Sequence, residues 1–250
     1  MSFKNLGLSD ELLNTIQKEG YSEATPVQER AIPLINKGMD ILAGAQTGTG
    51  KTAAFALPIL NRLQQSKSKK RTVRALILTP TRELAAQVNN SFRTYGIALP
   101  FKTIEIFGGV SMRPQKSKLK KGVDIVVATP GRLLDHLSQN TIDLSGVEVF
   151  VLDEADRMLD MGFKRDIEKV IKQLPKRRQN LLFSATFPKE IQRLASKLLN
   201  SPKKIQVASE NSTAENVKQT VYPVDQSRKR ELLIHSIKEN NWFLVLVFIK

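Results

Sequence analysis

The chain has 250 residues, enough to bury one good core and part of another, since domains usually run to roughly 100 to 200 residues. It contains no cysteine, which excludes disulfide bonds and thiolate metal sites and favours an intracellular protein. Lysine and arginine number 39 against 24 acidic residues, a formal charge of +15. A surplus of this size favours a polyanionic partner, with nucleic acid as the first candidate.

No apolar run approaches the roughly 18 residues of a membrane helix, and the first ten residues lack the pattern of a signal peptide. We therefore expect a protein without membrane contact that works in the cytoplasm. The basic residues gather in clusters at 67–71, 113–121, 176–178 and 228–230. Each cluster alone is more typical of solvated surface, so only the total charge and the motifs below indicate nucleic acid.

Strand-like and helix-like segments alternate along the first two hundred residues. Two helices are expected first, over residues 9–18 and 26–35. Short segments rich in Val, Ile and Leu then predict buried strands over 39–44, 73–79, 103–107, 123–128, 147–152, 180–184 and 204–207. Helices are expected between them over 51–63, 82–95, 131–137, 164–174 and 188–199. This alternation predicts an α/β domain, a mostly parallel sheet with helices on both faces.

The pattern changes after residue 207. Residues 209–216 are polar and typical of a linker, 217–224 alternate like a strand, and 229–239 suit a helix. Residues 242–249 form an apolar run that suits a central strand of a further sheet, or else a strand docked on the first domain. We favour the start of a second domain, because a long exposed apolar edge promotes aggregation. The predicted division is 1–38 (N-terminal helices), 39–207 (nucleotide-binding domain), 208–241 (linker region) and 242–250 (start of a second domain).

A glycine loop follows the first predicted strand and opens a helix. It approximates the G-x-x-x-x-G-K-[ST] phosphate-binding pattern, with alanine at the first position. Backbone N–H groups of such a loop surround phosphates, the lysine reaches the outer ones, and the hydroxyl that follows ligates magnesium. The loop therefore predicts binding of ATP and Mg²⁺. The residues expected to line the nucleotide are Ala45, Gln46, Thr47, Gly48, Thr49, Gly50, Lys51 and Thr52.

Acidic residues follow the strand predicted over residues 147–152, in the run Asp153-Glu154-Ala155-Asp156. Acids after a strand often only cap the next helix, but together with the glycine loop they predict a metal-and-water site. Ligands of such sheets bind at the carboxyl ends of the strands, where both segments lie. We therefore expect Lys51, Asp153 and Glu154 to converge on one triphosphate.

Six ordered motifs resemble the N-terminal motifs of the DEAD-box RNA helicases, over residues 3 to about 207. They are residues 20–28, 80–85, 108–109, 129–133, 153–156 and 184–186. The sequence looks most like the bacterial RhlE-like branch. The resemblance implies a RecA-like P-loop domain from an ATP-dependent RNA helicase, which hydrolyses ATP in response to RNA and locally unwinds RNA duplexes.

The resemblance also implies roles in the nucleotide site. Gln28 would pair with the edge of adenine, which suits an amide that donates and accepts. Phe3 and Tyr21 would lie against or near the base, although both could be ordinary core aromatics. Asp153 would hold Mg²⁺ through water, and Glu154 would act as the general base.

Coupling between nucleotide and RNA is implied for Asp156, which would bond Ser184 and Thr186; the alternative is that these hydroxyls cap a helix. RNA contacts are implied for three loops whose backbone N–H groups, hydroxyls and helix N-termini grip phosphates without reading bases. These residues are Pro80, Thr81, Arg82, Gly108, Gly109, Thr129, Pro130, Gly131 and Arg132. An internal salt bridge is the alternative for each arginine, and a simple turn for the glycine pair.

The family completes its site with arginines of a second domain, and no such motifs follow Val207. We therefore expect this chain, a monomer, to bind nucleotide weakly, turn over little and not unwind duplexes by itself. A DNA-directed translocase and a non-catalytic basic binding module stay open as alternatives. The isolated His136 and His235 are expected to be surface or satisfied histidines, not metal ligands.

Overall fold

The computed structural model describes residues 2–45, 48–66, 72–206 and 220–248. The chain divides into two compact units, Met1–Glu210 and Asn211–Lys250, which are described separately. The predicted division into four segments stays a prediction. No helix in the described part of the chain is long and apolar enough to span a membrane.

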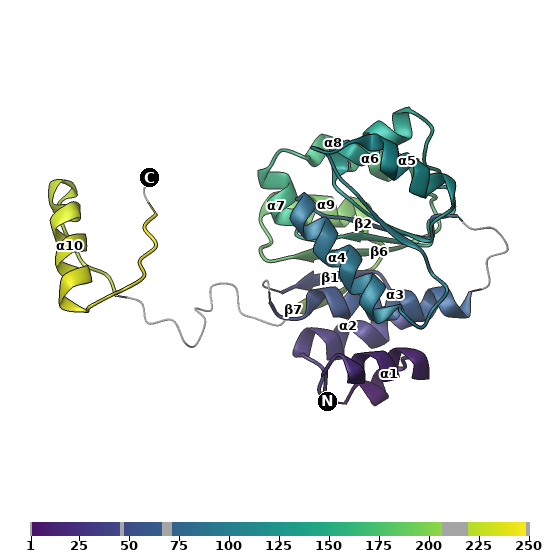
Figure 1. Ribbon diagram of the computed structural model, residues 1–250, viewed down its shortest axis with the longest axis horizontal. Helices are drawn as coiled ribbons and strands as arrows, with labels where there is room; N and C mark the ends of the chain where they lie inside the picture. Colours follow the sequence, from purple (N-terminus) through teal and green to yellow (C-terminus); the bar gives the residue numbers. More distant parts are fainter. Residues whose placement is uncertain (1, 46–47, 67–71, 207–219, 249–250) are drawn as a thin grey trace. The chain divides into compact units, whose positions relative to one another are not determined.

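The first unit is built on a sheet of seven strands in the order β3-β4-β2-β5-β6-β1-β7 (Figure 1). The strands are β1 (Ile41–Gly44), β2 (Ala75–Leu78), β3 (Thr103–Ile106), β4 (Ile125–Ala128), β5 (Val149–Leu152), β6 (Gln179–Ser184) and β7 (Lys203–Gln206). Every pairing is parallel, which confirms the predicted sheet. Each strand lies inside its predicted range or within one residue of it.

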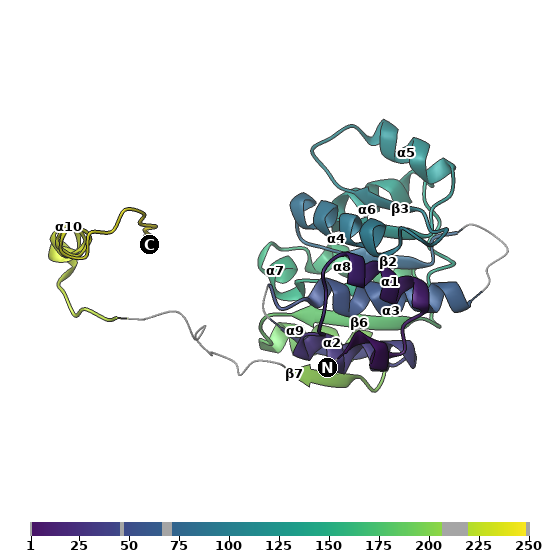
Figure 2. The same ribbon diagram turned by 60° about the horizontal axis from the view of Figure 1, so that its bottom comes forward.

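Helices cover both faces of the sheet (Figures 1 and 2). They are α1 (Asp10–Lys18), α2 (Pro26–Asn36), α3 (Lys51–Gln65), α4 (Arg82–Tyr95), α5 (Met112–Lys120), α6 (Pro130–Ser138), α7 (Ala155–Asp160), α8 (Lys164–Gln173) and α9 (Lys189–Leu198). Side chains of α1 to α4 pack on one face, and those of α6 to α9 pack on the other. Neighbouring residues of one strand, such as Leu76 and Ile77, belong to different cores because side chains alternate across a sheet.

Three short elements of the first unit were not predicted: α5, α7 and a 3₁₀ turn η1 (Phe3–Leu6). Helix α5 carries a basic cluster, and Gln115 is its only buried residue, so the apolar spacing that marks a helix is absent. Its start is marked by Ser111, whose hydroxyl accepts a hydrogen bond from the Arg113 N–H at 3.3 Å.

The strand order divides the carboxyl edge of the sheet into two halves. β1, β6 and β5 are neighbours, and the loops after them carry the predicted nucleotide, coupling and acidic residues. β2, β4 and β3 form the other half, and the loops after them carry the predicted RNA contacts. The topology thus brings together motifs that are distant in sequence.

The second unit contains a 3₁₀ turn η2 (Gln226–Arg228) and the helix α10 (Lys229–Glu239), which agrees with the helix predicted over residues 229–239. The strands predicted over 217–224 and 242–249 are wrong for their described parts, residues 220–224 and 242–248, which form no strand. A single strand needs a neighbour for its backbone hydrogen bonds, and this unit supplies none among its described residues. Apolar side chains such as Phe243 and Leu244 are exposed.

Candidate functional site

The glycine loop connects β1 to α3, at the carboxyl edge of the sheet. Gly48 and Gly50 have φ values of 83° and 86°, a left-handed conformation that favours glycine. The Ala45 N–H donates to the carbonyl of Ser184 at 3.2 Å, which joins the loop to the end of β6. Gln46 and Thr47 lie outside the described residues.

Lys51, the first residue of α3, is buried, with 7% of its surface exposed. Its ammonium group has no hydrogen-bond partner among the described residues. Burying an unpaired cation is costly unless a ligand supplies the opposite charge. Thr52 follows in the same helical turn. An ammonium of this kind at a helix N-terminus fits a phosphate group.

Asp153 follows β5 and is almost completely buried, with 2% exposed. Burial raises the pKa of its carboxyl group to about 6, the positive charge of Lys51 acts in the opposite direction, and the negative charge of Glu154 adds to the increase. These effects on Asp153 show that Lys51 and Glu154 each lie within electrostatic range of its carboxyl group. The structure thus brings together the lysine and the acids that the sequence separates by about a hundred residues.

Glu154 has a left-handed backbone, with φ 54° and ψ 51°, and occupies the position before α7. This conformation is uncommon for a residue with a side chain, and such outliers concentrate at functional sites. Its carboxylate accepts a hydrogen bond from Arg157 Nη1 at 3.2 Å, while only 12% of the Glu154 side chain is exposed. Arg157 was not predicted from the sequence, although its spacing of three residues from Glu154 is a recognisable signal.

Gln28 lies in α2 and is buried against the glycine loop. Its Nε2 donates to the carbonyl of Gly50 at 3.1 Å, and its Oε1 accepts from the Thr25 N–H at 2.9 Å. A Cβ atom added at Gly50 would lie 2.4 Å from Gln28 Nε2. The glutamine therefore holds the end of the loop, and glycine is required there for both its conformation and its lack of a side chain.

Phe3 and Tyr21 are in edge-to-face contact, with ring centroids 6.3 Å apart. Phe3 is buried in the core, whereas 40% of Tyr21 is exposed. The hydroxyl groups of Tyr21 and Tyr95 are 3.1 Å apart, and burial raises the pKa of Tyr95. Of the two aromatic residues predicted to contact the base, Tyr21 is therefore the one with an exposed side chain.

Asp156 is joined to the segment after β6, as the resemblance implied. Its carboxylate accepts hydrogen bonds from the backbone N–H and the hydroxyl of Thr186, both at 2.9 Å. The Ser184 hydroxyl accepts from the Asp156 N–H at 3.3 Å and donates to the Thr186 carbonyl at 2.7 Å. The loop after β5 and the loop after β6 are therefore joined by hydrogen bonds.

The three loops of the predicted RNA contacts meet at the other half of the edge. A Cβ atom at Gly109, whose φ is 78°, would lie 3.8 Å from Arg82 Nη1. Arg132 Nη1 donates to the carbonyl of Val110 at 2.9 Å, so α6 contacts the loop after β3.

The alternative roles of these residues also find support. Arg82 pairs with the adjacent Glu83 at 2.6 Å, and Arg132 lies 3.5 Å from Asp135 on its own helix. The Arg82 pair is exposed, so a phosphate could replace the carboxylate at little cost. Thr81 caps α4 by accepting from the Leu84 N–H at 3.3 Å. The hydroxyl of Thr129, which precedes Pro130 and Gly131, makes no such bond.

A chain of buried polar side chains is hydrogen-bonded to the residue that precedes the glycine pair Gly108 and Gly109. Gln115 Nε2 donates to the carbonyl of Phe107, the residue before Gly108, at 3.0 Å. Its Oε1 lies 3.1 Å from His136 Nε2, so this nitrogen must carry the proton that is donated. Nδ1 is then an acceptor, and the single proton of the Thr141 hydroxyl is shared between Nδ1 at 2.7 Å and the His136 carbonyl at 3.0 Å. Burial and the nearby charge of Arg132 lower the pKa of His136, which favours this neutral form.

His136 is a satisfied buried histidine, which is one of the two environments expected for it. Its structural connection to the glycine pair was not predicted from the sequence. The signal that could have found it is helical spacing, because Pro130, Leu133 and His136 share the buried face of α6.

The fold and the site define a RecA-like P-loop domain. Residues 25–194 match the family described as DEAD/DEAH box helicase, and the chain belongs to this family. It is 45% identical over 233 residues to the DEAD-box ATP-dependent RNA helicase RhpA of Helicobacter pylori, covering 93% of this chain and 46% of that protein. It is 41% identical over 248 residues to the ATP-dependent RNA helicase CshA of Limosilactobacillus reuteri, covering 99% and 49%.

Among solved structures, a DEAD box protein from the hyperthermophile Methanococcus jannaschii superimposes with a TM-score of 0.78 and 40% sequence identity. This superposition covers 95% of the present chain and 63% of the other. The chain spans about half the length of the curated relatives that it matches.

Proposed function

We propose that this chain is the ATP-binding half of an ATP-dependent RNA helicase, in which ATP hydrolysis drives the local separation of RNA duplexes. The observation that carries this proposal is the buried ammonium of Lys51, which has no partner among the described residues and lies within electrostatic range of Asp153. A cation and an acid at one sheet edge suit a triphosphate with its metal ion.

ATP would bind along the glycine loop, with Lys51 at the outer phosphates and backbone N–H groups of the loop around them. Gln28 would hold the loop and present its amide beside the base, and the exposed face of Tyr21 would pack near the base. Phe3 would act through Tyr21, since it is buried behind that ring.

Mg²⁺ fits the oxygen donors present, the hydroxyl of Thr52 and the carboxylate of Asp153, the latter through a water molecule. When bound, the ion neutralises charge on the phosphates. Glu154 would orient and deprotonate the attacking water, and Arg157 holds its carboxylate at 3.2 Å.

RNA would bind across the loops after β2, β3 and β4, through phosphate contacts that do not depend on base sequence. Asp156 would transmit the nucleotide state to this surface, because its carboxylate holds Thr186 on the adjacent loop. We expect the chain to act as a monomer in the cytoplasm. By itself it should bind nucleotide weakly, turn over little and not unwind duplexes.

The test is an equilibrium titration of the chain with a fluorescent ATP analogue and Mg²⁺. We expect Lys51→Ala to weaken binding by about tenfold or more, in line with the loss of a charge-assisted contact. Lys37→Ala, which removes an exposed lysine, should leave binding unchanged and serves as the matched control. Equal affinity of both variants would overturn the proposal.

A DNA-directed translocase and a non-catalytic module predict other results. RNA should stimulate ATP hydrolysis more than DNA of the same length, measured on this chain and on a version extended beyond Lys250. A Glu154→Gln change should trap bound ATP in an enzyme and change nothing in a binding module. These outcomes separate the three classes.

A further inference from the structure

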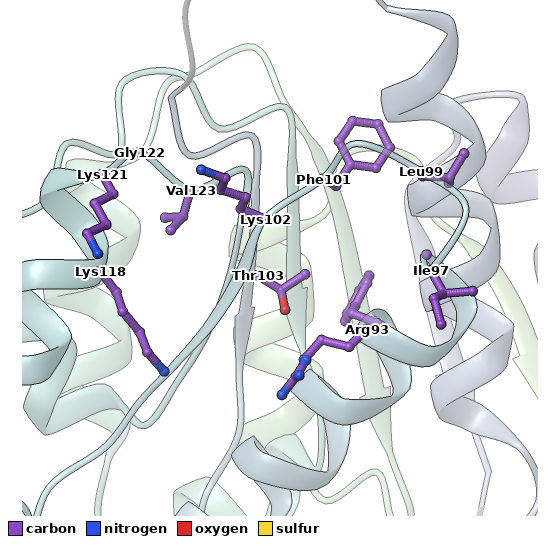
Figure 3. A pocket seen from close by; sticks show the side chains of 12 residues that line it. Arg93, Ile97, Leu99, Phe101, Lys102, Thr103, Lys118, Lys121, Gly122 and Val123 are labelled. Atoms are coloured by element: carbon purple, nitrogen blue, oxygen red, sulfur yellow. The ribbon is translucent and has the colours of Figure 1, made fainter.

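A hollow lies at the amino end of β3, at the end of the sheet opposite the predicted nucleotide and RNA loops. It has a volume of about 380 Å³ and lies between the last turns of α4 and α5 (Figure 3). Its apolar surface includes Leu99, Phe101 and Ile97, and 79% of Ile97 is exposed. Nothing in the proposed ATPase or RNA chemistry uses this place.

The rim of the hollow is strongly basic. Its twelve lining residues include Arg93, Lys102, Lys118 and Lys121 but no aspartate or glutamate. Lys118 lies 3.8 Å from Glu105, whereas the other three cations form no hydrogen bond or ion pair through their side chains within the described part of the chain. Figure 3 shows Arg93 of α4 and Lys118 of α5 on either side of Thr103 of β3.

β3 is also an edge strand, hydrogen-bonded on one side only among the described residues. The carbonyls of Lys102 and Ile106 accept hydrogen bonds from residues in and next to β4. Because backbone groups alternate along a strand, those of Thr103 and Glu105 face the open side. An open edge of this kind is a template for a further strand.

We propose that the open side of the edge strand β3 is a docking site for an extended, acidic peptide segment of a partner protein. The peptide adds a strand to β3 and places one apolar side chain in the hollow. The backbone edge supplies main-chain hydrogen bonds, the hollow supplies selectivity, and the four cations select negative charge. Nucleic acid would match the charge alone. It would use neither the exposed Ile97 nor the strand edge, so the peptide explains more of the observations.

The test uses a fluorescent probe peptide, acetyl-Asp-Glu-Val-Phe-Val-Glu-Asp-amide, and fluorescence anisotropy with the whole chain. The double variant Lys102→Glu, Lys121→Glu should weaken binding by about tenfold or more. A matched double variant on the other side of the molecule, Lys189→Glu, Lys203→Glu, carries the same change of charge and should bind as the natural chain does. Both pairs are exposed, and equal unfolding midpoints will show that folding is retained.

Two further measurements separate strand addition from simple charge attraction. The same peptide with N-methyl groups on alternate backbone nitrogens cannot donate to an edge, so it should bind about tenfold more weakly. Bound peptide should also slow hydrogen exchange at the amides of Thr103 and Glu105. Failure of the probe to bind, or equal binding of the methylated probe, would overturn the proposal.

Decauridine provides the nucleic-acid arm of the experiment. Its binding should be equal for the two double variants, because the RNA loops lie at the opposite edge of the sheet. If the change at Lys102 and Lys121 abolished decauridine binding and left peptide binding intact, the patch would belong to RNA and the proposal would be wrong.

Discussion

Gln28 and Gly50 form a direct link between α2 and the phosphate loop, through a hydrogen bond of 3.1 Å from the side-chain amide to the backbone carbonyl. Because Gln28 is buried and also accepts from Thr25, its amide orientation is set by the helix start. The end of the loop is therefore held in place by α2, which would reduce the ordering cost of binding the proposed nucleotide.

Gly50→Ala should destabilise the fold more than Gly48→Ala does. Both glycines have positive φ, so both changes cost about 1–2 kcal/mol of backbone strain, but only a Cβ at residue 50 meets Gln28. Urea unfolding without nucleotide measures the difference. In a Gln28→Ala background the difference should shrink to what the remaining 3.1 Å approach of this Cβ to Thr25 Oγ1 costs. An undiminished difference there would show that the collision with Gln28 is not the cause.

Asp156→Ala should release the segment after β6. The change removes the acceptor for the backbone N–H and the hydroxyl of Thr186, and should cost about 1–3 kcal/mol of unfolding free energy. Faster hydrogen exchange at the Thr186 amide is the local readout. Asp160→Ala, at the other end of α7, is the control. A Thr186 amide that stays protected in Asp156→Ala would contradict the proposed coupling.

His136→Phe should weaken RNA binding without changing nucleotide binding. Phenylalanine fills a similar volume but leaves Gln115 Oε1 without its donor, so the hold on the Phe107 carbonyl before the glycine pair is weakened. Anisotropy with labelled RNA and with a fluorescent ATP analogue measures both affinities. His235→Phe, an exposed histidine, is the matched control. Equal RNA affinity of the two variants would remove His136 from the RNA site.

Asp153→Asn should stabilise the ligand-free chain at neutral pH and abolish its response to Mg²⁺. The pKa of Asp153 rises from 3.8 to about 6 on folding, so the folded state binds its proton more tightly than the unfolded state does. This penalty is absent below pH 3.8, grows as pH rises and is complete above about pH 6. At about 1.4 kcal/mol per pKa unit it reaches roughly 3 kcal/mol.

Urea unfolding of Asp153→Asn and the natural chain between pH 5 and 8 measures this effect. The stabilisation by asparagine should have about half of its full size at pH 5 and be largest above pH 6.5. Asp124→Asn is unsuitable as a control because Asp124 bonds the backbone at Lys102, so the exposed Asp10→Asn serves instead. A stabilisation that does not change with pH would mean that Asp153 ionises normally.

Much of the fold was predictable because its signals are local. Helix α4 begins and ends as predicted, at Arg82 and Tyr95, since Thr81 caps it and its apolar residues keep helical spacing. Helix α5 was missed because basic residues replace that spacing. In the site, Lys51 and Asp153 were found from motifs, whereas the Gln28–Gly50 bond joins residues with no periodic relation and was not.

The sequence by itself determined where each strand lies, which loop suits a phosphate and which acids suit a metal, because hydrophobic spacing and side-chain chemistry are properties of neighbouring residues. The tertiary structure decided the strand order, and with it the proximity of Lys51 to Asp153 and the hydrogen bond between His136 and Gln115. Parallel strands of similar composition present the same backbone groups to any neighbour. Only the packing of helices on both faces selects one order, and that order sets which of the predicted nucleotide, coupling and RNA loops lie side by side along the carboxyl edge.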